Sequence, residues 1–273
     1  MKVCNHEHFG SIRAFDFSAT YLELYADSVE NVKDSHIHEK CEIYVNLSGD
    51  VSFIVENHIY PINPGDIIIT RPFEYHHCVY HSNKLHRHFW ILFSPSGNEY
   101  LLDSFFNRKS GNANHLFLSP DNTDMLISLC HTMTREEPSQ IKKYYNFFKL
   151  MNILQNANTV KDNALNYPAD IYYAINFINS YFGNDISVNE IAKEAHVSIN
   201  TLERHFRNAL NISPYEYIKK KRLANAVKLL LNGCTVAEAS SQSGFPDYSS
   251  FIALFKKTYG TTPLQYKKNM HAL

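Results

Sequence analysis

Two histidines and a glutamate stand close together near the start of the chain, in the pattern His36-x-His38-x-x-x-Glu42. Alternate side chains of a strand point to the same face, so His36 and His38 are expected side by side. Imidazole and carboxylate groups suit a first-row metal ion. In a pocket lined with aromatic rings they also hydrogen-bond an organic ligand. His76 and His77 follow later and offer a further imidazole for either kind of site.

A second group with recognisable chemistry lies between Ser198 and Asn211, where the hydrophobic period predicts a helix. Its polar face carries four predicted contacts to DNA bases: Asn200, Thr201, Glu203 and Arg204. Asn pairs with adenine, Arg with guanine, and Glu accepts from cytosine, and each pairing discriminates by about 1–3 kcal/mol. The competing interpretation is a solvated surface on which Glu203 pairs with Arg207 one turn later.

A later helix, which begins after Asp247, offers four further candidate base contacts: Tyr248, Ser249, Ile252 and Ala253. None of these is Arg or Asn, the side chains that read purines best. We therefore expect this helix to contribute mostly phosphate contacts, with a thymine-methyl contact through Ile252 or Ala253.

Cations near these helices predict the phosphate contacts that would position the protein on DNA. They are Arg207, Lys219, Lys220, Lys221, Arg222, Lys256 and Lys257. The alternative is that they serve only solubility, but four consecutive cations beside a predicted recognition helix favour DNA.

The elements that must hold these side chains repeat along the C-terminal part of the chain. The second copy follows the first at an offset of 49 residues, as these pairs show: Phe206 and Phe255, Pro214 and Pro263, Tyr217 and Tyr266. Upstream the offset is 48, for Val188 with Val236 and for Glu190 with Glu238. Ser187 and Thr235, each three residues before one of these glutamates, predict capping boxes. Each copy therefore predicts a helix, a tight turn and a second helix.

Ser198 and Asp247 are predicted to cap the second helix of each copy at its N-terminus. Asn211 and Gly260 are predicted to end those helices in the left-handed conformation. A long helix from Pro214 to Leu231 joins the copies. Two helix-turn-helix units on one rigid helix can address successive major grooves, about 34 Å apart.

The front of the chain predicts an antiparallel sheet domain. Residues 15–95 contain short runs of Ile, Val, Tyr and Phe separated by turn residues, which favours a sandwich or barrel. From about residue 98 the apolar residues recur with a helical period. The stripe within residues 139–157 is long for a helix on a small barrel, so it predicts either core packing or contact with a second subunit.

We divide the chain into a front domain of residues 1–158, a linker of residues 159–169 and a DNA-binding domain of residues 170–273. The two helix-turn-helix units are expected at about residues 188–209 and 236–258. Net charge follows this division, with −5 for residues 1–169 and +4 for residues 170–273. A polyanionic partner would therefore be met by the C-terminal part.

Composition indicates a folded protein, because 44% of the residues are hydrophobic and 19% are charged. The five cysteines are scattered without a C-x-x-C pair, which favours the reduced thiols of a cytosolic protein. The chain contains no run of eighteen apolar residues and no signal peptide at its start. We therefore expect a cytoplasmic protein.

Residues 170–273 resemble the DNA-binding domain of the AraC/XylS family of transcription regulators. The resemblance rests on these elements at the family's spacing: Ile191-Ala192, Val197-Ser198, Leu202, Phe206-Arg207, Ser213-Pro214, Tyr217-Ile218, Arg222-Leu223, Ala226, Leu229-Leu230, Glu238, Gly244-Phe245, Asp247, Ser250-Phe251, Phe255-Lys256-Lys257, Gly260, Pro263 and Tyr266. The chain departs from the family at Asn211, where Gly is usual, and at Ala239-Ser240, where Ile-Ala is usual. The second departure leaves smaller side chains in the core of the second helix-turn-helix unit. The resemblance also implies that Asn200, Thr201, Glu203 and Arg204 form the base-contacting face.

The front domain resembles the cupins, which are small β-barrels. The matching residues are His36-x-His38-x-x-x-Glu42, Gly49, Pro64-Gly65-Asp66, Pro72 and His76-His77. In metal-binding cupins such residues hold one divalent metal, which suggests a site of His36, His38 and Glu42 with His76 or His77. The spacing from Gly65 to His76 departs from that pattern. Regulators of the AraC type generally use this domain for a small effector, so we favour an organic ligand such as a sugar, with no metal and no cofactor. The residues expected to line its pocket are His36, His38, Glu42, Tyr44, His76 and His88.

The predicted fold is multidomain α+β. A cupin-like antiparallel β-barrel with C-terminal helices precedes an all-α domain of two helix-turn-helix units joined by a long helix. The predicted function is transcription regulation by a DNA-binding activator without catalytic residues. Its expected partners are double-stranded DNA, a small effector, RNA polymerase and a second copy of the chain, and no membrane. The alternatives are a metal-dependent cupin enzyme with a helical appendage, and a regulator whose front domain only dimerises.

Overall fold

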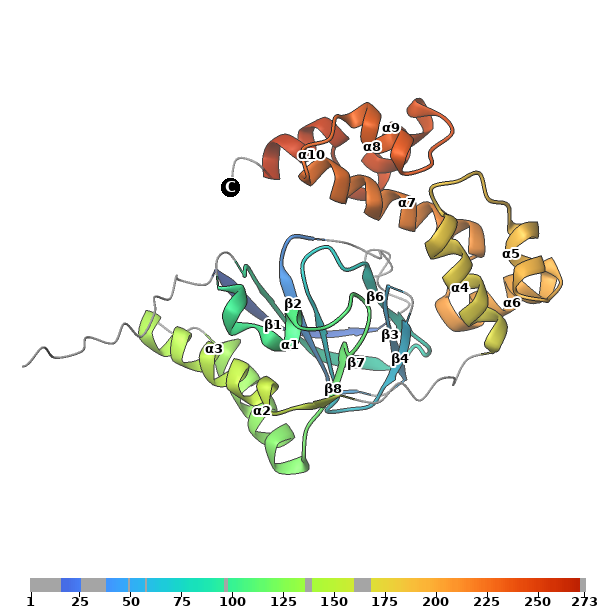
Figure 1. Ribbon diagram of the computed structural model, residues 1–273. Coiled ribbons are helices and arrows are strands. Elements are labelled where there is room, and N and C mark those ends of the chain that lie inside the picture. Colours follow the sequence, from blue (N-terminus) through green and yellow to red (C-terminus); the bar gives the residue numbers. More distant parts are fainter. Residues whose placement is uncertain are drawn as a thin grey trace, which may run out of the picture.

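The computed structural model describes residues 16–25, 38–48, 50–56, 58–95, 98–135, 139–159 and 168–270. Strands dominate the first part of the chain and helices the second. Figure 1 shows the helical part arching along one side of the strands, while two long helices lie on the opposite side. The predicted α+β architecture is confirmed.

The front domain contains two antiparallel sheets. The larger has the order β1 (Phe17–Tyr25), β7 (Leu85–Phe93), β2 (Cys41–Asn46), β5 (Ile67–Thr70), β8 (His115–Phe117) and β9 (Asn158–Thr159). The smaller has the order β4 (His58–Ile62), β3 (Val51–Val55) and β6 (His76–Tyr80). Of the sandwich or barrel that the sequence predicts, the pairings among the described strands form two separate sheets and no closed barrel.

Helices at the end of the front domain cover the outer face of the larger sheet. They are η2 (Glu99–Leu101), α1 (Asp103–Phe106), α2 (Pro120–Met133) and α3 (Gln140–Gln155). Phe147, Leu150 and Leu154 of α3 are buried against this sheet. Ile141 and Tyr145, nearer the start of α3, are 82% and 64% exposed. Only part of the predicted apolar stripe is therefore core in the single chain.

The alternation of side chains along β2 places functional groups between the two sheets. All six residues of this strand are buried, because both of its faces are covered. Cys41, Ile43 and Val45 belong to the cluster that includes the helices. Tyr44 belongs instead to the cluster between the sheets, and Glu42 has the same parity as Tyr44. The space between the sheets thus holds a carboxylate among aromatic rings.

The smaller sheet has an inner and an outer face as well. Cys78 of β6 packs within the cluster between the sheets, and His76 has the same parity. Tyr75, Val79 and Ile54 face outward and belong to the same hydrophobic cluster as the helical domain. The two domains are therefore joined by a continuous apolar core.

A buried carboxylate fixes the loop that leads into β6. Glu74 is 1% exposed and accepts two hydrogen bonds from Arg108, at 2.8 and 2.6 Å. The backbone of Gly111 and the side chain of Asn114 donate to it as well. Burial acts to raise the pKa of Glu74, but the bonds and charge of Arg108 outweigh it and hold the pKa below its usual value.

The helical domain contains seven helices within the described residues. They are α4 (Ala169–Tyr181), α5 (Val188–Glu194), α6 (Ile199–Leu210), α7 (Pro214–Leu231), α8 (Val236–Gln242), α9 (Tyr248–Tyr259) and α10 (Pro263–Met270). The predicted capping boxes begin α5 and α8, and Ser213 with Glu216 forms a third at the start of α7. Asn211 and Gly260 end α6 and α9 in the left-handed conformation, as predicted. Among the described residues, no helix is long and apolar enough to cross a membrane.

The turn between α8 and α9 requires glycine. Gly244 has φ of +78°, and a Cβ there would lie 2.6 Å from the backbone oxygen of Gly183. Gly260 has a similar φ of +72°, but a Cβ at that position would meet nothing within 4 Å. Residues with a Cβ pay about 1–2 kcal/mol in the left-handed region. Only Gly244 adds a backbone clash to this cost.

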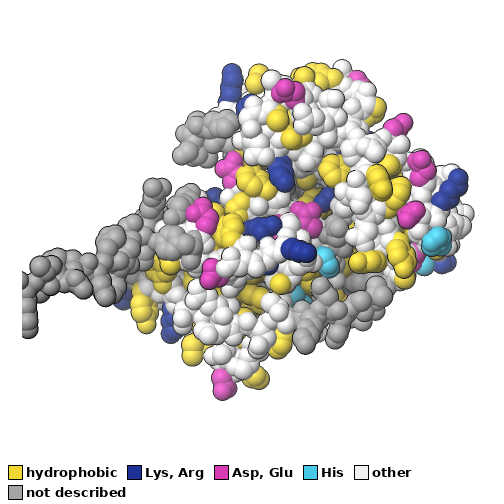
Figure 2. All heavy atoms as spheres, viewed as in Figure 1, with side chains coloured by type: hydrophobic (Ala, Val, Ile, Leu, Met, Phe, Trp, Pro, Cys, Tyr) yellow, Lys and Arg dark blue, Asp and Glu magenta, His cyan; other side chains and the backbone are white. Residues whose placement is uncertain are grey.

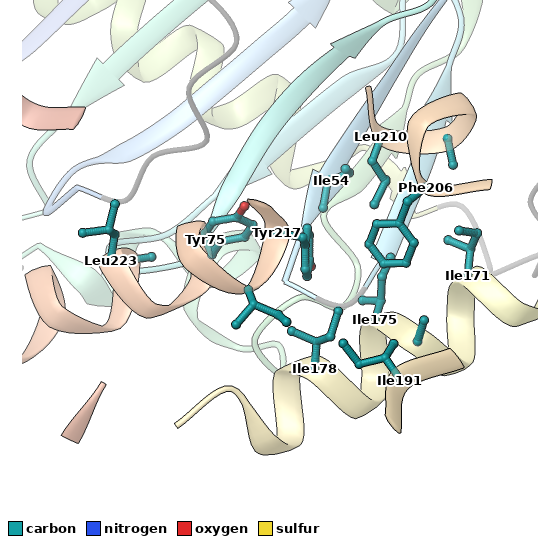
Figure 3. Packing of buried hydrophobic residues seen from close by; sticks show 14 of the residues in the cluster. Ile54, Tyr75, Ile171, Ile175, Ile178, Ile191, Phe206, Leu210, Tyr217 and Leu223 are labelled. Carbon is teal, nitrogen blue, oxygen red and sulfur yellow. The ribbon is translucent and has the colours of Figure 1, made fainter. Parts of the chain in front are cut away.

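One hydrophobic core runs through the first helix-turn-helix unit and into the smaller sheet. Phe206, Tyr217 and Ile191 are each fully buried in it. Figure 3 shows Tyr75 and Ile54 of the front domain beside Tyr217. This core holds α6 against α4, α5 and α7, which leaves its opposite face outward.

Candidate functional site

The first candidate recognition helix, α6, is strongly two-sided. Leu202 and Phe206 on its underside are fully buried. Asn200, Arg204 and Arg207 are exposed, while Thr201 and Glu203 are half-buried. Glu203 and Arg207 lie 3.9 Å apart, so their pairing is loose and leaves Arg207 64% exposed. Every base contact predicted for α6 thus lies on an accessible face.

A contact that the sequence did not reveal anchors α6 to α4. Nδ1 of His205 lies 2.8 Å from a carboxylate oxygen of Asp170 in the first turn of α4. His205 belongs to the recognition helix, and Asp170 is 8% exposed. The pair fixes the rotation of α6 about its axis. No local sequence signal joins residues 35 positions apart, so only the tertiary fold discloses it.

The second candidate recognition helix, α9, has a weaker polar face. Asp247 caps it, as predicted, by accepting from the backbone of Ser249 and Ser250. Tyr248, Ser249 and Ala253 are exposed, and Ile252 is half-buried against the core. The exposed cations of this helix, Lys256 and Lys257, lie in its last turn. These four positions of α9 thus expose no Arg or Asn, and the weaker role of α9 in base contacts stays a prediction.

The cations at the start of α7 divide into two groups. Lys219 lies over the ring of Tyr215 at 4.5 Å, and Lys219 and Lys220 are half-buried. Lys221 and Arg222 are only 6% and 8% exposed. In Figure 2 the Lys and Arg side chains on the face shown are dispersed among acidic and hydrophobic ones. The protein does not present a broad basic surface on that face.

The structure corrects the phosphate contacts expected of Lys221 and Arg222. Arg222 donates to the backbone oxygens of Phe182 and Asn184 at 2.7 Å each, and so closes the end of α4. Arg222 is also four residues from Ile218 and from Ala226, both on the buried face of α7. That helical spacing is the sequence signal that would have placed it inward.

Lys221 instead joins the two domains. Its Nζ lies 2.8 Å from the Glu56 carboxylate and 4.5 Å from the centre of the Tyr75 ring. The Tyr217 hydroxyl donates to the Glu56 carbonyl at 3.3 Å, and the Asn211 side chain donates to the Tyr80 carbonyl at 2.9 Å. Asn211 ends α6, so the recognition helix is itself tied to the front domain.

Between the two sheets, His38, Glu42 and His76 converge. Nε2 of His38 and Nε2 of His76 lie 3.1 and 3.0 Å from the same oxygen of Glu42. Burial acts to lower the pKa of His76, but the charge of Glu42 outweighs it and raises that pKa. His77 points to the other face of β6, towards Tyr75, so only His76 of the two joins the cluster. His36 lies outside the described residues.

Tyr44 and His88 lie near this cluster and stack on each other, with ring centres 4.6 Å apart. Burial lowers the pKa of His88 to about 4, so His88 is neutral at pH 7. Phe53, which the sequence did not single out, stacks on His76 with ring centres 6.2 Å apart. The five predicted pocket residues that the structure describes therefore gather between the sheets, against aromatic rings.

Comparison with known sequence families identifies both domains. Residues 22–143 match the AraC-like ligand binding domain, and residues 191–269 match a helix-turn-helix domain. The chain belongs to the AraC family of transcription regulators. The family assignment made from the sequence is thereby confirmed.

Individual relatives agree with this family. The chain is 24% identical to the lactose operon transcription activator of Staphylococcus xylosus over 243 residues, and the match covers 85% of each chain. It is 35% identical over 94 residues to the Msm operon regulatory protein of Streptococcus mutans, 34% of each chain. A solved structure of ToxT from Vibrio cholerae is 16% identical, covers 93% of this chain and 98% of its own, and has a TM-score of 0.38. That score is too low to carry an argument, so the assignment rests on the sequence families.

Proposed function

We propose that this AraC-family regulator is a sequence-specific activator of transcription that reads DNA through two unequal recognition helices. The observation that carries the proposal is α6, which exposes Asn200, Arg204 and Arg207 above a fully buried underside. The name of the lactose operon activator, similar over 85% of each chain, supports activation as the direction of control.

In this proposal α6 supplies most of the base specificity. Asn200, Thr201, Glu203 and Arg204 have hydrogen-bonding groups that match base edges in the major groove. Tyr248, Ser249, Ile252 and Ala253 of α9 make weaker and partly apolar base contacts. The phosphate contacts are assigned to Arg207, Lys219, Lys220, Lys256 and Lys257, which remain exposed or half-buried.

The front domain is proposed to bind a small effector between its sheets. His38, Glu42, Tyr44, His76 and His88 bring hydrogen-bonding groups and aromatic rings together there. The similarity to a lactose operon activator supports a carbohydrate as the effector class. Effector binding acts by changing how the front domain docks on α7, which shifts the population able to bind DNA.

The proposal includes a cytoplasmic homodimer that contacts RNA polymerase and has no catalytic role. The exposed Ile141 and Tyr145 of α3 form the proposed subunit contact, because exposed apolar side chains at helical spacing suit a paired helix. A metal-dependent enzyme is the second candidate function, and the His38, Glu42 and His76 cluster is the observation that favours it.

The decisive experiment is selection of DNA from a random-sequence duplex pool by the purified full chain, at two salt concentrations. We expect one well-defined half-site and one looser half-site, about one helical turn apart. Arg204→Ala should then reduce the base preference at one position of the well-defined half-site. Salt-sensitive binding with no selected sequence would refute sequence-specific reading, because phosphate contacts alone produce that behaviour.

A further inference from the structure

His205 lies on the flank of α6, between its buried face and its exposed face. Arg204, the residue before it, is exposed, and Phe206, the residue after it, is fully buried. The side chain of His205 is 23% exposed, and its Nδ1 lies 2.8 Å from a carboxylate oxygen of Asp170. A residue on the flank moves sideways when the helix turns about its own axis, so this bond resists that rotation.

The carboxylate of Asp170 determines the direction of the bond. An ionised carboxylate only accepts hydrogen bonds, so Nδ1 of His205 donates in this pair. A hydrogen bond to an ionised acceptor is about twice as strong as one between neutral groups. The side chain of Asp170 is only 9% exposed. Loss of the donor would therefore leave a largely buried carboxylate without this hydrogen bond, which is more costly than the loss of an exposed contact.

The helix α4 is a firm support for this bond. Ile171 and Ile175 are buried in the core that α4 shares with α6. Figure 3 shows Ile175 beside Phe206 of α6. At the opposite end of α4, the side chain of Arg222 donates to two backbone oxygens. The bond to His205 thus ties the recognition helix to a helix that is itself held at both ends.

Base recognition is sensitive to the rotation of α6. Side chains of a helix reach about 5–6 Å from its axis, so a rotation by about 10° moves a group on the surface of α6 by about 1 Å. Hydrogen bonds from nitrogen to oxygen span only about 0.5 Å in length. The apolar contacts of Leu202 and Phe206 are not directional, so they set the rotation less sharply than a hydrogen bond does.

We propose that His205 is a positioning residue for base recognition. Its bond to Asp170 sets the rotation at which Asn200 and Arg204 meet the edges of the bases. His205 acts through these side chains and does not itself contact DNA in this role. The inference rests on the proposed reading of DNA by α6. Loss of the bond should change base preference more than overall affinity, because phosphate contacts carry no direct sequence information.

Two variants that differ by one methylene group isolate the Nδ1 donor. In His205→Asn the amide nitrogen can take the place of Nδ1, because both atoms are bonded to Cγ. In His205→Gln the amide nitrogen lies one bond further out and corresponds to Nε2. Glutamine favours a helix more than asparagine does, so a purely structural role predicts that His205→Asn is the more damaging variant. A positioning role predicts the reverse order.

The test is selection of DNA from a random-sequence duplex pool by the full chain. Fluorescence anisotropy then follows, with the selected duplex, with duplexes changed at single base pairs and with an unrelated duplex. We expect the wild type and His205→Asn to select the same sequence. His205→Gln should lose at least about 5-fold of the discrimination at one or more base pairs, since one base contact provides about 5- to 150-fold. Its affinity for the unrelated duplex should change by less than about twofold, because the phosphate contacts remain.

Asp170→Ala removes the acceptor and tests the same bond from its other side. If the two residues act through one bond, Asp170→Ala reproduces the loss, and the double variant with His205→Gln loses no more than either single variant. Unfolding in urea shows whether each variant is folded under the conditions of the assay. The inference is overturned if His205→Gln discriminates as well as the wild type, or if it weakens binding equally to all duplexes. A wild type that selects no sequence would instead refute the proposed reading of DNA.

Discussion

The contact between Lys221 and Glu56 gives a direct test of whether the front domain restrains the DNA-binding domain. The side chains of Lys221 and Glu56 are 7% and 23% exposed, so their 2.8 Å contact is largely shielded from solvent. We predict that Glu56→Gln loosens this docking. The amide oxygen still accepts from the ammonium group, which keeps its charge, but the negative charge of the ion pair is lost.

The magnitude follows from the kind of bond that is changed. Hydrogen bonds to charged groups contribute about 1.5–3 kcal/mol, and we assign roughly half of that or more to the attraction between the two opposite charges, because the contact is largely shielded from solvent. Docking should therefore weaken by about 1–2 kcal/mol, or about 5- to 30-fold in its equilibrium constant. If the docked form predominates and cannot bind DNA, apparent affinity for DNA rises by up to that factor.

The assay is fluorescence anisotropy with a selected duplex and the full chain. Removing any acidic group also strengthens DNA binding through long-range attraction, so the control must change charge equally. Glu23→Gln is suitable, because Glu23 pairs with Arg87 on the surface of the front domain. Higher salt should shrink the effect of Glu23→Gln and leave that of Glu56→Gln.

Lys221→Gln separates two outcomes. If Lys221 serves only docking, this variant strengthens DNA binding as Glu56→Gln does. If Lys221 moves to a phosphate in the complex, the variant weakens binding and lowers the salt slope by about one. Unchanged or weaker DNA binding by Glu56→Gln, with docking shown to be loosened by faster proteolysis between the domains, would refute restraint by the front domain.

Three further predictions concern recognition and stability. Arg204→Ala should reduce discrimination at one base pair by about 1–3 kcal/mol, whereas Ser249→Ala should leave specificity nearly unchanged; equal losses in a DNA-selection assay would contradict unequal roles for the two helices. Gly244→Ala should destabilise the helical domain by more than the about 1–2 kcal/mol expected for Gly260→Ala, because only the former adds a backbone clash; equal midpoints in urea would show that the turn relaxes. The pKa of Glu74 is lower in the folded state than its usual value near 4.5. The stabilisation from ionised Glu74 is therefore present above about pH 4.5 and is lost as the pH falls through the lower folded-state pKa. Glu74→Gln should reduce the loss of stability at acid pH, and an unchanged loss would show that another group titrates there.

Much of the helical domain was predictable because its signals are local. Each capping box spans four residues, and the left-handed helix ends at Asn211 and Gly260 depend on residue type. The burial of Lys221 was not predictable in this way. Its partner Glu56 is 165 positions away in the chain. From the sequence alone, the run of four cations therefore predicts phosphate contacts, and only the tertiary fold shows that Lys221 is buried at the domain interface.

The sequence predicted that the front domain consists of antiparallel strands, but it did not predict which strands pair. Alternating residues and turn signals correctly indicated antiparallel strands, yet whether the sheets close depends on which edges pair. The same limit applied to the pocket residues. The alternation of side chains along β2 puts Glu42 and Tyr44 on one face, but only the packing of the two sheets brings His76 to 3.0 Å from Glu42.

The two faces of β6 connect the proposed effector pocket to the domain interface. His76 points inward to Glu42, while Tyr75 and Val79 point outward into the core shared with α7. A ligand that fixes His76 therefore also fixes the strand on which α7 docks. We predict that a carbohydrate effector bound between the sheets changes the apparent affinity for DNA in the wild type, and that Glu56→Gln reduces this change because it weakens the same docking equilibrium. Effects of the effector and of Glu56→Gln that simply add in free energy would show that the effector does not act through docking.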